Sequence, residues 1–445
     1  MQRIIINLLA VILLIVTVIN TARAQESMTL PKAISIALEN NLGLKIADTQ
    51  IAIAENNNTW AMAGKTPTVT LNGSFNNSIV NNNNPASFLQ GAYYSGTLGG
   101  SANANWVVYA GGRFEVAKDQ LEMLVRQEAL NKDVNTHELF RNVYQQYYNI
   151  LFQEEQLRVL RQSYVLSQDK LRYENVKKEY GTSNSLNIVQ FENALATDSI
   201  NIVSQALQVN TAKNTLYNTL MIPLTSDYTY TEALSVTDES INRDNLAAAL
   251  SEENYTLKSL YLLSELSGLN TRLAQAQRKP IVSLNGALGV SESGFKIFDD
   301  NPMTGDPFEL IFGNQITGSI NANVTWDLYD GGVRKTNIET AKLEEEIARL
   351  SIEEAAAGLI NQLDILVQNY ENQRQLLALT DDQIRLAEQN LEMLDERFKA
   401  GLVTSLDYRT VQLQYLNAAF AKVRAIYNLI LTKSEIDYLV GKFEE

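Results

Sequence analysis

The 445-residue sequence contains no cysteine and only one histidine, His137. Without cysteine the chain has no disulfide framework, no thiolate metal ligand, no cysteine nucleophile and no lipid-anchored N-terminal Cys. A zinc site needs several nitrogen or sulfur ligands, so a single histidine argues strongly against one. We expect no cofactor, and we expect His137, in a long polar helical stretch, to be solvated or partly packed.

Basic residues are also scarce. The chain has 36 Lys and Arg against 51 Asp and Glu, which gives a net charge of −15. Proteins that bind nucleic acid carry a basic footprint, so nucleic acid is not an expected partner. No nucleophile–base pair is visible. Gly111-Gly112 and Gly331-Gly332 lack the frame of a phosphate-binding loop, and we interpret them as strand-to-helix turns rather than as parts of an enzyme.

Long apolar runs occur only at the N-terminus. Arg3 precedes an apolar run from Ile4 to Ile19, and the small-x-small sequence Ala22-Arg23-Ala24 follows it. This pattern predicts a signal peptide over residues 1–24, with a retained anchor as the alternative. Loss of Arg3 and Arg23 would change the net charge from −15 to −17. No later stretch approaches the ~18 apolar residues of a spanning helix, so the remaining chain could cross a membrane only as strands.

Proline is rare, and its positions leave four long windows free of it. Proline breaks helix interiors, so each window can form one long helix. Apolar residues recur every seven positions, for example Val143 and Ile150, and again Leu363 and Tyr370, which is typical of coiled-coil packing. Gly181 and Gly401 can end the longest helices, and the Ser, Thr or Asn residues after them can start new ones. Each half is therefore predicted to contain a helical hairpin with a tight tip, and the four windows are 113–181, 184–221, 333–401 and 404–441.

The sequence contains an internal duplication. The segment Trp106–Arg113 recurs at Trp326–Arg334 with Trp, Tyr and both Gly shifted by 220 positions, whereas Pro67–Gly73 recurs at Pro280–Gly286 with a shift of 213. The change of shift indicates a longer loop in the second copy. We predict a first repeat over 25–243 and a second over 244–445. Their β-hairpins are expected at about 66–109 and 280–329, and their helical hairpins at about 113–221 and 333–441.

The two hairpin regions alternate between apolar and polar residues, which is the pattern of strands with one apolar face. Aromatic residues gather at both ends, as in the girdles of membrane barrels. Four strands cannot close a barrel, and lipid does not tolerate an open sheet edge, so copies of the chain must pair. Three copies give 12 strands, although two copies would also reach the minimum of 8. The aromatic residues are Trp106, Tyr109, Trp326 and Tyr329 at one end, and Phe88, Tyr93, Tyr94, Phe295, Phe298, Phe308 and Phe312 at the other.

These features together resemble the TolC-type outer membrane efflux proteins, and the tip sequence Arg397–Asp407 is similar to that family's second-hairpin tip. The resemblance covers nearly the whole chain after the signal. It implies a mainly α fold with a β-barrel part, namely a homotrimer with a 12-stranded β-barrel in the outer membrane and a 12-helix α-barrel in the periplasm. It also implies a passive conduit that docks on a periplasmic adaptor protein and an inner-membrane transporter, for drug, metal or protein export.

The resemblance also implies a constriction at the tips. Asp407 matches the first of two cation-binding aspartates, but Thr410 occupies the second position and Val403 replaces a latching arginine. The first-hairpin counterparts are Asn187 and Gln190. Three carboxylates around one axis would repel, attract cations and raise one another's pKa. A first-turn acid that favours the helix dipole is the alternative role of Asp407.

A soluble periplasmic coiled-coil adaptor or scaffold is the competing interpretation of the whole chain. It would share the helical hairpins, but it would not need two duplicated β-hairpins with aromatic ends.

Overall fold

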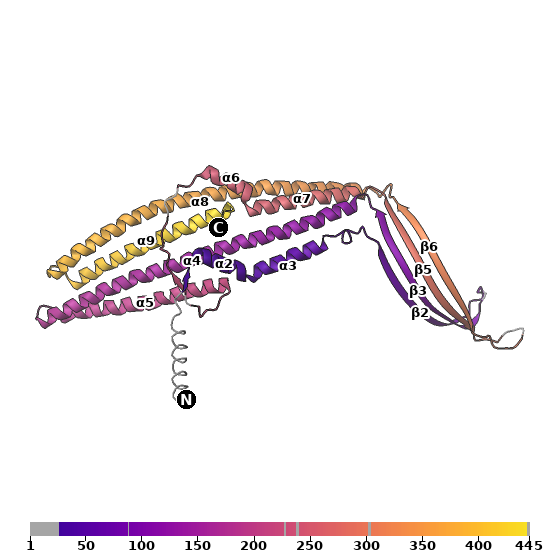
Figure 1. Ribbon diagram of the computed structural model, residues 1–445, viewed down its shortest axis with the longest axis horizontal. Coiled ribbons are helices and arrows are strands. Elements are labelled where there is room, and N and C mark those ends of the chain that lie inside the picture. The colour runs from indigo at the N-terminus through magenta and orange to yellow at the C-terminus, as the bar shows by residue number, and fades with distance from the viewer. Residues whose placement is uncertain (1–25, 88, 227, 237–239, 301–303, 443–445) are drawn as a thin grey trace, which may run out of the picture. The chain divides into compact units, whose positions relative to one another are not determined.

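The computed structural model describes residues 26–442 except 88, 227, 237–239 and 301–303. The predicted signal peptide and Phe88 lie outside these residues. The described chain is mainly helical, with one four-stranded and one two-stranded sheet (Figure 1), so the predicted class of a helical protein with a β part is confirmed. It forms two units, each of which takes segments from both halves of the sequence.

The first unit takes in the chain up to Asp48, Leu130–Lys258 and the residues from Glu353 onward. It is dominated by two helical hairpins, α4 with α5 and α8 with α9 (Figure 1). A short parallel pair, β1 (Glu26–Met28) with β4 (Tyr228–Tyr230), packs against the core of the first hairpin. The helices of the whole chain are α2 (Leu30–Asn40), α3 (Leu42–Asn57), α4 (Arg113–Glu179), α5 (Ser185–Leu220), α6 (Arg243–Glu253), α7 (Tyr255–Ala276), α8 (Val333–Lys399) and α9 (Ser405–Leu439).

The two hairpins are held by equivalent cores. Val143 and Leu363, 220 positions apart, are both fully buried, and so are Leu216 and Ile436 with the same spacing. Burying a side chain of this size stabilises a fold by about 1.5–3 kcal/mol. A short helix completes each core, α2 against the first hairpin and α6 against the second. The heptad positions therefore face the interior in both copies, as a seven-residue repeat predicts.

His137 is buried in this unit, with 6% of its surface exposed, so the ring is more closely packed than the solvated or partly packed side chain that the sequence suggested. Its ring stacks on Tyr438 at a centroid distance of 5.0 Å and packs against Tyr255 at 4.9 Å. Nε2 lies 3.1 Å from the carbonyl oxygen of Tyr438. Burial lowers the pKa of His137, Arg141 lowers it further, and the hydrogen bond to Tyr438 opposes them. Two tyrosines distant in sequence enclose the ring, and its local polar sequence does not reveal them.

The second unit, Thr49–Ala129 with Ser259–Ile352, contains the four-stranded sheet. Its antiparallel order is β2-β3-β5-β6, so the hairpins of the two repeats join through β3 and β5 (Figure 1). Strands β2 and β6 are the edges. The bounds are β2 (Thr68–Asn82), β3 (Gly91–Tyr109), β5 (Ile281–Ile297) and β6 (Ile311–Thr325).

Among the helices that the structure describes, none has both the length and the apolar character that crossing a membrane requires.

Candidate functional site at the hairpin tips and on the sheet

The two helical hairpins turn through the glycines that the sequence singled out. Gly181 has a φ of 72° and Gly401 a φ of 74°, in the left-handed region that favours glycine. At the second tip Gly401 N donates to the carbonyl of Phe398 at 3.0 Å, and Leu402 N donates to that of Arg397 at 2.9 Å. The first tip has the same pair of bonds. These bonds satisfy carbonyl groups at the helix ends and fix the turn.

Asp407 takes part in the start of α9. Thr404 is the N-cap, its Oγ1 accepts from Asp407 N at 3.2 Å, and Asp407 Oδ2 accepts from Thr404 N at 2.9 Å. This reciprocal arrangement is a capping box. Thr404 Oγ1 also donates to Asp407 Oδ2 at 2.7 Å. The hydrogen bonds from Thr404 lower the pKa of Asp407, so the carboxylate is ionised at neutral pH.

The structure brings Asn187 and Gln190 together, but through a residue that sequence reasoning missed. Ser405, which is 1% exposed, donates to Asn187 Oδ1 at 3.0 Å and also hydrogen-bonds Gln190 Oε1. This contact links the start of α9 to the start of α5. Ser405 is the first of a series of buried positions along α9 that continues with Tyr408 and Gln412, and a serine at such a position is its one sequence signal.

The other two tip residues have local roles within the chain. Thr410 Oγ1 donates to the carbonyl of Leu406 at 2.9 Å, one turn back in α9. Val403 packs against an aromatic cluster of Phe191, Phe398 and Tyr408, which joins α5 to α8 and α9. An apolar residue at 403 therefore adds to the packing between the tips.

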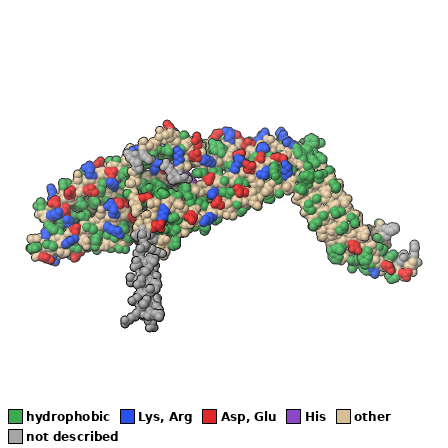
Figure 2. All heavy atoms as spheres, in the orientation of Figure 1, with side chains coloured by type: hydrophobic (Ala, Val, Ile, Leu, Met, Phe, Trp, Pro, Cys, Tyr) green, Lys and Arg blue, Asp and Glu red, His purple; other side chains and the backbone are tan. Residues whose placement is uncertain are grey.

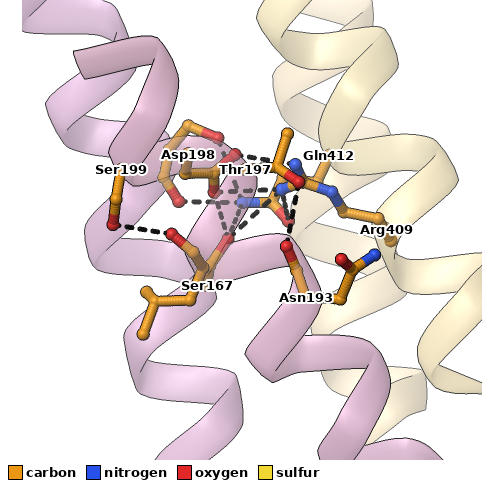
Figure 3. Close-up of polar contacts among 9 residues, drawn as sticks. Ser167, Asn193, Thr197, Asp198, Ser199, Arg409 and Gln412 are labelled. Atoms are coloured by element: carbon orange, nitrogen blue, oxygen red, sulfur yellow. Dashed lines mark hydrogen bonds and ion pairs between the residues drawn. The ribbon is translucent and has the colours of Figure 1, made fainter. Parts of the chain in front are cut away.

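A buried ion pair joins the two hairpins (Figure 3). Arg409 of α9 donates to both oxygens of Asp198 in α5, with Nη2 to Oδ1 at 2.7 Å and Nη1 to Oδ2 at 3.1 Å. The Asp198 side chain is 2% exposed and that of Arg409 is 16% exposed. Ser167 Oγ of α4 donates to Asp198 Oδ2 at 2.6 Å, and Gln412 Nε2 donates to Ser167 Oγ at 2.9 Å. The network thus contacts three of the four long helices, and the two parallel hydrogen bonds between the guanidinium and the carboxylate fix the relative orientation of α5 and α9.

A groove of about 970 Å³ runs between α4 and the second hairpin. Val165 and Leu391 supply apolar surface on its two sides, and charged residues such as Arg161 and Glu392 also line it. Three further lining residues form ion pairs: Lys170 of α4 pairs with Asp395 of α8, and Lys399 pairs with the same carboxylate at 2.9 Å.

The sheet has one strongly apolar face. Register places Leu71 beside Ala102, which is beside Leu288, which is beside Gly318, so these residues share a face across all four strands. The edge strands expose it most, with Leu71 at 83% and Ile320 at 88%. Hydrophobic side chains cover much of the sheet, whereas charged side chains are scattered over the helices (Figure 2). The exposed apolar residues of the edge strands include Val69, Leu71, Phe75 and Ile79 of β2 and Phe312, Ile316, Ile320 and Val324 of β6.

Trp106, Tyr109 and Trp326, which the sequence predicts to be part of an aromatic girdle, lie at the strand ends next to the helices. Trp106 pairs with Leu284 on the apolar face, and a register shift between Val107 and Tyr109 puts Tyr109 opposite Val282 on that same face. Trp326 directly follows β6, and Tyr329 is 86% exposed.

The aromatic residues at the far end do not form one girdle. Tyr94 shares the apolar face with Gly96, and Phe312 pairs with Gly294 on that face. Tyr93 and Phe295, whose rings lie 5.4 Å apart, fall on the opposite face. Successive side chains of a strand point to opposite faces, so Tyr93 and Tyr94 cannot both belong to the same girdle. Treating all of these aromatics as one girdle was therefore wrong.

The fold and these surfaces define a duplicated, mainly helical protein that carries an apolar-faced sheet. The model of the outer membrane efflux protein family matches residues 33–220 and 248–442, which is most of the chain and both repeats. The chain belongs to the outer membrane efflux protein family, and the TolC-type resemblance is confirmed. No curated protein sequence matches it significantly.

Solved structures share the fold at low sequence identity. The Campylobacter jejuni CmeC outer membrane channel is 17% identical with a TM-score of 0.72, over 93% of this chain and 85% of its own. The outer membrane protein VceC of Vibrio cholerae is 16% identical with a TM-score of 0.71, over 93% of this chain and 96% of its own. The open state of the Neisseria gonorrhoeae MtrE outer membrane channel is 17% identical with a TM-score of 0.71, over 93% of this chain and 88% of its own.

Proposed function

We propose that this protein is the exit duct of an envelope export system in the outer membrane of a Gram-negative bacterium. In this proposal three chains join their sheets into a 12-stranded β-barrel, and their helical hairpins continue as a 12-helix α-barrel in the periplasm. Membership of the outer membrane efflux protein family supports the location and the class of function. In this proposal the duct is a passive conduit, and the inner-membrane transporter supplies the energy.

The sheet carries this proposal. Its edge strands, β2 and β6, are both 15 residues long, and among the strands that the structure describes neither has a partner on its outer side. Lipid does not tolerate unpaired backbone, so β2 of one copy is expected to pair with β6 of the next. On the apolar face Val282 and Val290 are eight residue steps apart, so this stretch of β5 has about the 9–11 residues that a tilted strand needs to cross a bilayer.

We further propose that the helical end docks on a periplasmic adaptor protein, which connects it to an inner-membrane transporter. The groove between α4 and the second hairpin supports this, because long helices form its walls and its lining combines apolar and charged side chains. A helical hairpin of an adaptor has matching chemistry. The transporter selects the cargo, so this chain is compatible with drug, metal or protein export.

Asp407 is our candidate for a cation-binding ring at the periplasmic entrance. It is ionised, exposed and located at a hairpin tip, and three copies would place three carboxylates around one axis. Thr410 and Val403 bring no charge of their own, so the ring would depend on Asp407.

The alternative is a soluble periplasmic adaptor or scaffold. Such a protein would share the helical hairpins, but it would have no use for a sheet face that exposes Leu71, Ile316 and Ile320 to water.

The test is to extract the full-length protein from outer membranes in detergent, count subunits by cross-linking and record planar-bilayer conductance. We expect trimers that resist carbonate extraction and conduct in small, discrete steps. A carbonate-extractable species without conductance would contradict the duct and favour the adaptor.

A further inference from the structure

The second face of the sheet is uniformly polar in its helix-proximal half, whereas Tyr93 and Phe295 add aromatic rings to it toward the far end. Ser101 lies between Asn72 and Gly289, and Asn103 lies between Thr70 and Ala287. Alternation puts the remaining residues of this polar face in the same series. From the helix-proximal end toward the middle of the sheet, its members are Thr68, Thr70, Asn72 and Ser74 on β2, Asn105, Asn103, Ser101 and Gly99 on β3, Asn285, Ala287, Gly289 and Ser291 on β5, and Asn321, Ser319, Thr317 and Gln315 on β6.

The polar face contains no charged residue. Within the four strands only Glu292 and Lys296 are charged, although charged residues make up 20% of the chain. Both fall on the apolar face, because Glu292 pairs with Leu98 and Lys296 pairs with Tyr94. The polar face is therefore the one face of the sheet without a charged side chain, in a protein that is strongly acidic.

Hydroxyl and amide groups make this face hydrophilic without fixed charge. Their side chains hydrogen-bond to one another and to the backbone, as in Asn103 Nδ2 donating to Ser101 Oγ at 3.1 Å and Asn323 Nδ2 donating to Thr325 Oγ1 at 3.1 Å. Ser293 Oγ donates to the carbonyl of Gly313 at 3.2 Å. Such groups can hold water as well as a charged lining does, but they create no net potential.

We propose that the polar face lines the passage and that its neutrality makes this section indifferent to the charge of what crosses it. This inference rests on the proposed duct. At physiological ionic strength an electrostatic field decays over ~8 Å, so charges at the strand ends scarcely reach the middle of a 15-residue strand. Selection by charge then belongs to the helical part of the passage, and anionic and cationic substrates cross the sheet section equally well.

The absence of cysteine permits a direct test. The variants Ser101→Cys and Ser319→Cys place a thiol on the polar face, and Ala102→Cys and Ile320→Cys are the adjacent controls on the apolar face. Each full-length protein is reconstituted in liposomes and reacted with anionic sulfonatoethyl and cationic trimethylammonioethyl methanethiosulfonate. Rates are normalised to those of a free small-molecule thiol, and wild-type conductance confirms that each variant is assembled.

We expect both reagents to label positions 101 and 319, and neither to label 102 or 320. The normalised anion and cation rates should agree within about threefold, which corresponds to a local potential of about half of kT. A difference above about tenfold at 101 and 319 would overturn the neutral lining while leaving the duct intact. Labelling of 102 and 320 but not of 101 and 319 would reverse the faces and also overturn it. Labelling of all four in a carbonate-extractable protein would instead contradict the duct itself.

Discussion

The indole Nε1 of Trp106 donates a hydrogen bond to the carbonyl of Lys65 at 3.0 Å. Trp326 makes the equivalent bond to Arg278 at 3.1 Å, and the two pairs are related by the same shifts of 220 and 213 positions that relate the two halves of the sequence. Each bond ties the end of one strand to the segment that enters its neighbour. The duplication therefore preserves an anchoring contact as well as a residue pattern.

Replacing either tryptophan with phenylalanine should keep the ring and remove this bond. We expect Trp106→Phe and Trp326→Phe each to lower the free energy of unfolding by about 1 kcal/mol, the net contribution of one hydrogen bond. Urea titration of the reconstituted protein measures it. Trp60→Phe is the control. The Lys65 ammonium lies 4.3 Å from the centroid of the Trp60 ring, and phenylalanine keeps an aromatic face for it. Equal losses in all three variants would contradict the anchoring role.

Asp407 offers a way to separate a capping role from a channel role. Asp407→Asn removes the charge but keeps an oxygen that can accept from Thr404 N, whereas Asp407→Ala removes both. If the ring binds cations, both variants should need at least about tenfold more divalent cation for half-block of single-channel current. Only the alanine variant should also unfold at a lower temperature. Unchanged block in both variants would remove Asp407 from the constriction.

The cap also predicts an acid response. The folded-state pKa of Asp407 lies below the unfolded value, so its contribution to stability is present above the unfolded pKa and is lost as pH falls through the folded pKa. The loss should therefore occur below about pH 4. Thermal unfolding from pH 3 to 7 should show a steeper acid decline in the wild-type protein than in Asp407→Ala.

The Arg409–Asp198 pair should be strongly coupled. Asp198→Ala leaves a mostly buried guanidinium without its carboxylate, and we expect a loss of about 3–5 kcal/mol in unfolding free energy. Combining it with Arg409→Met should cost much less than the sum of the two single variants, because no uncompensated charge remains. A double-mutant cycle in denaturant measures the coupling. Arg385→Met is a control, since its pair with Asp382 is exposed. Additive effects would contradict the coupling.

His137 predicts a second, milder pH dependence. Burial lowers its folded-state pKa below the usual value of 6.5, so the unfolded chain binds more protons as pH falls through and below 6.5. Stability should then be complete above about pH 6.5 and decline toward pH 5. His137→Gln can still donate to the Tyr438 carbonyl but does not titrate, so its stability should be flat over this range. A parallel decline in both proteins would place the sensitive group elsewhere.

Much of the fold could be predicted because its rules are local. Gly181 and Gly401 mark the helix ends, because each has a left-handed conformation that follows from residue type. The two faces of the sheet follow from alternation along each strand. The bulge before Tyr109 could not be predicted, because one extra residue is seen only against the register of β5.

The site was harder to predict because its contacts join distant segments. Ser405 meets Gln190 across 215 positions, and Arg409 meets Asp198 across 211. The sequence marks such residues in one way only, which is a polar residue at a helix position where an apolar residue is usual. Asp198 and Gln412 both occupy buried positions of this kind. Such a signal identifies a buried polar group, but it does not identify the partner.

Because β2 and β6 have unpaired edges, assembly of the proposed duct depends on the concentration of the chain. A single sheet cannot enter lipid while β2 and β6 each lack a neighbour on one side, so membrane entry of the proposed duct is expected to wait until copies of the chain meet. The yield of inserted protein should then rise more steeply than in proportion to the amount of chain synthesised, because subunit encounter and insertion are one event. A cell that makes this protein slowly would accumulate waiting subunits with an exposed apolar face, which require protection from aggregation.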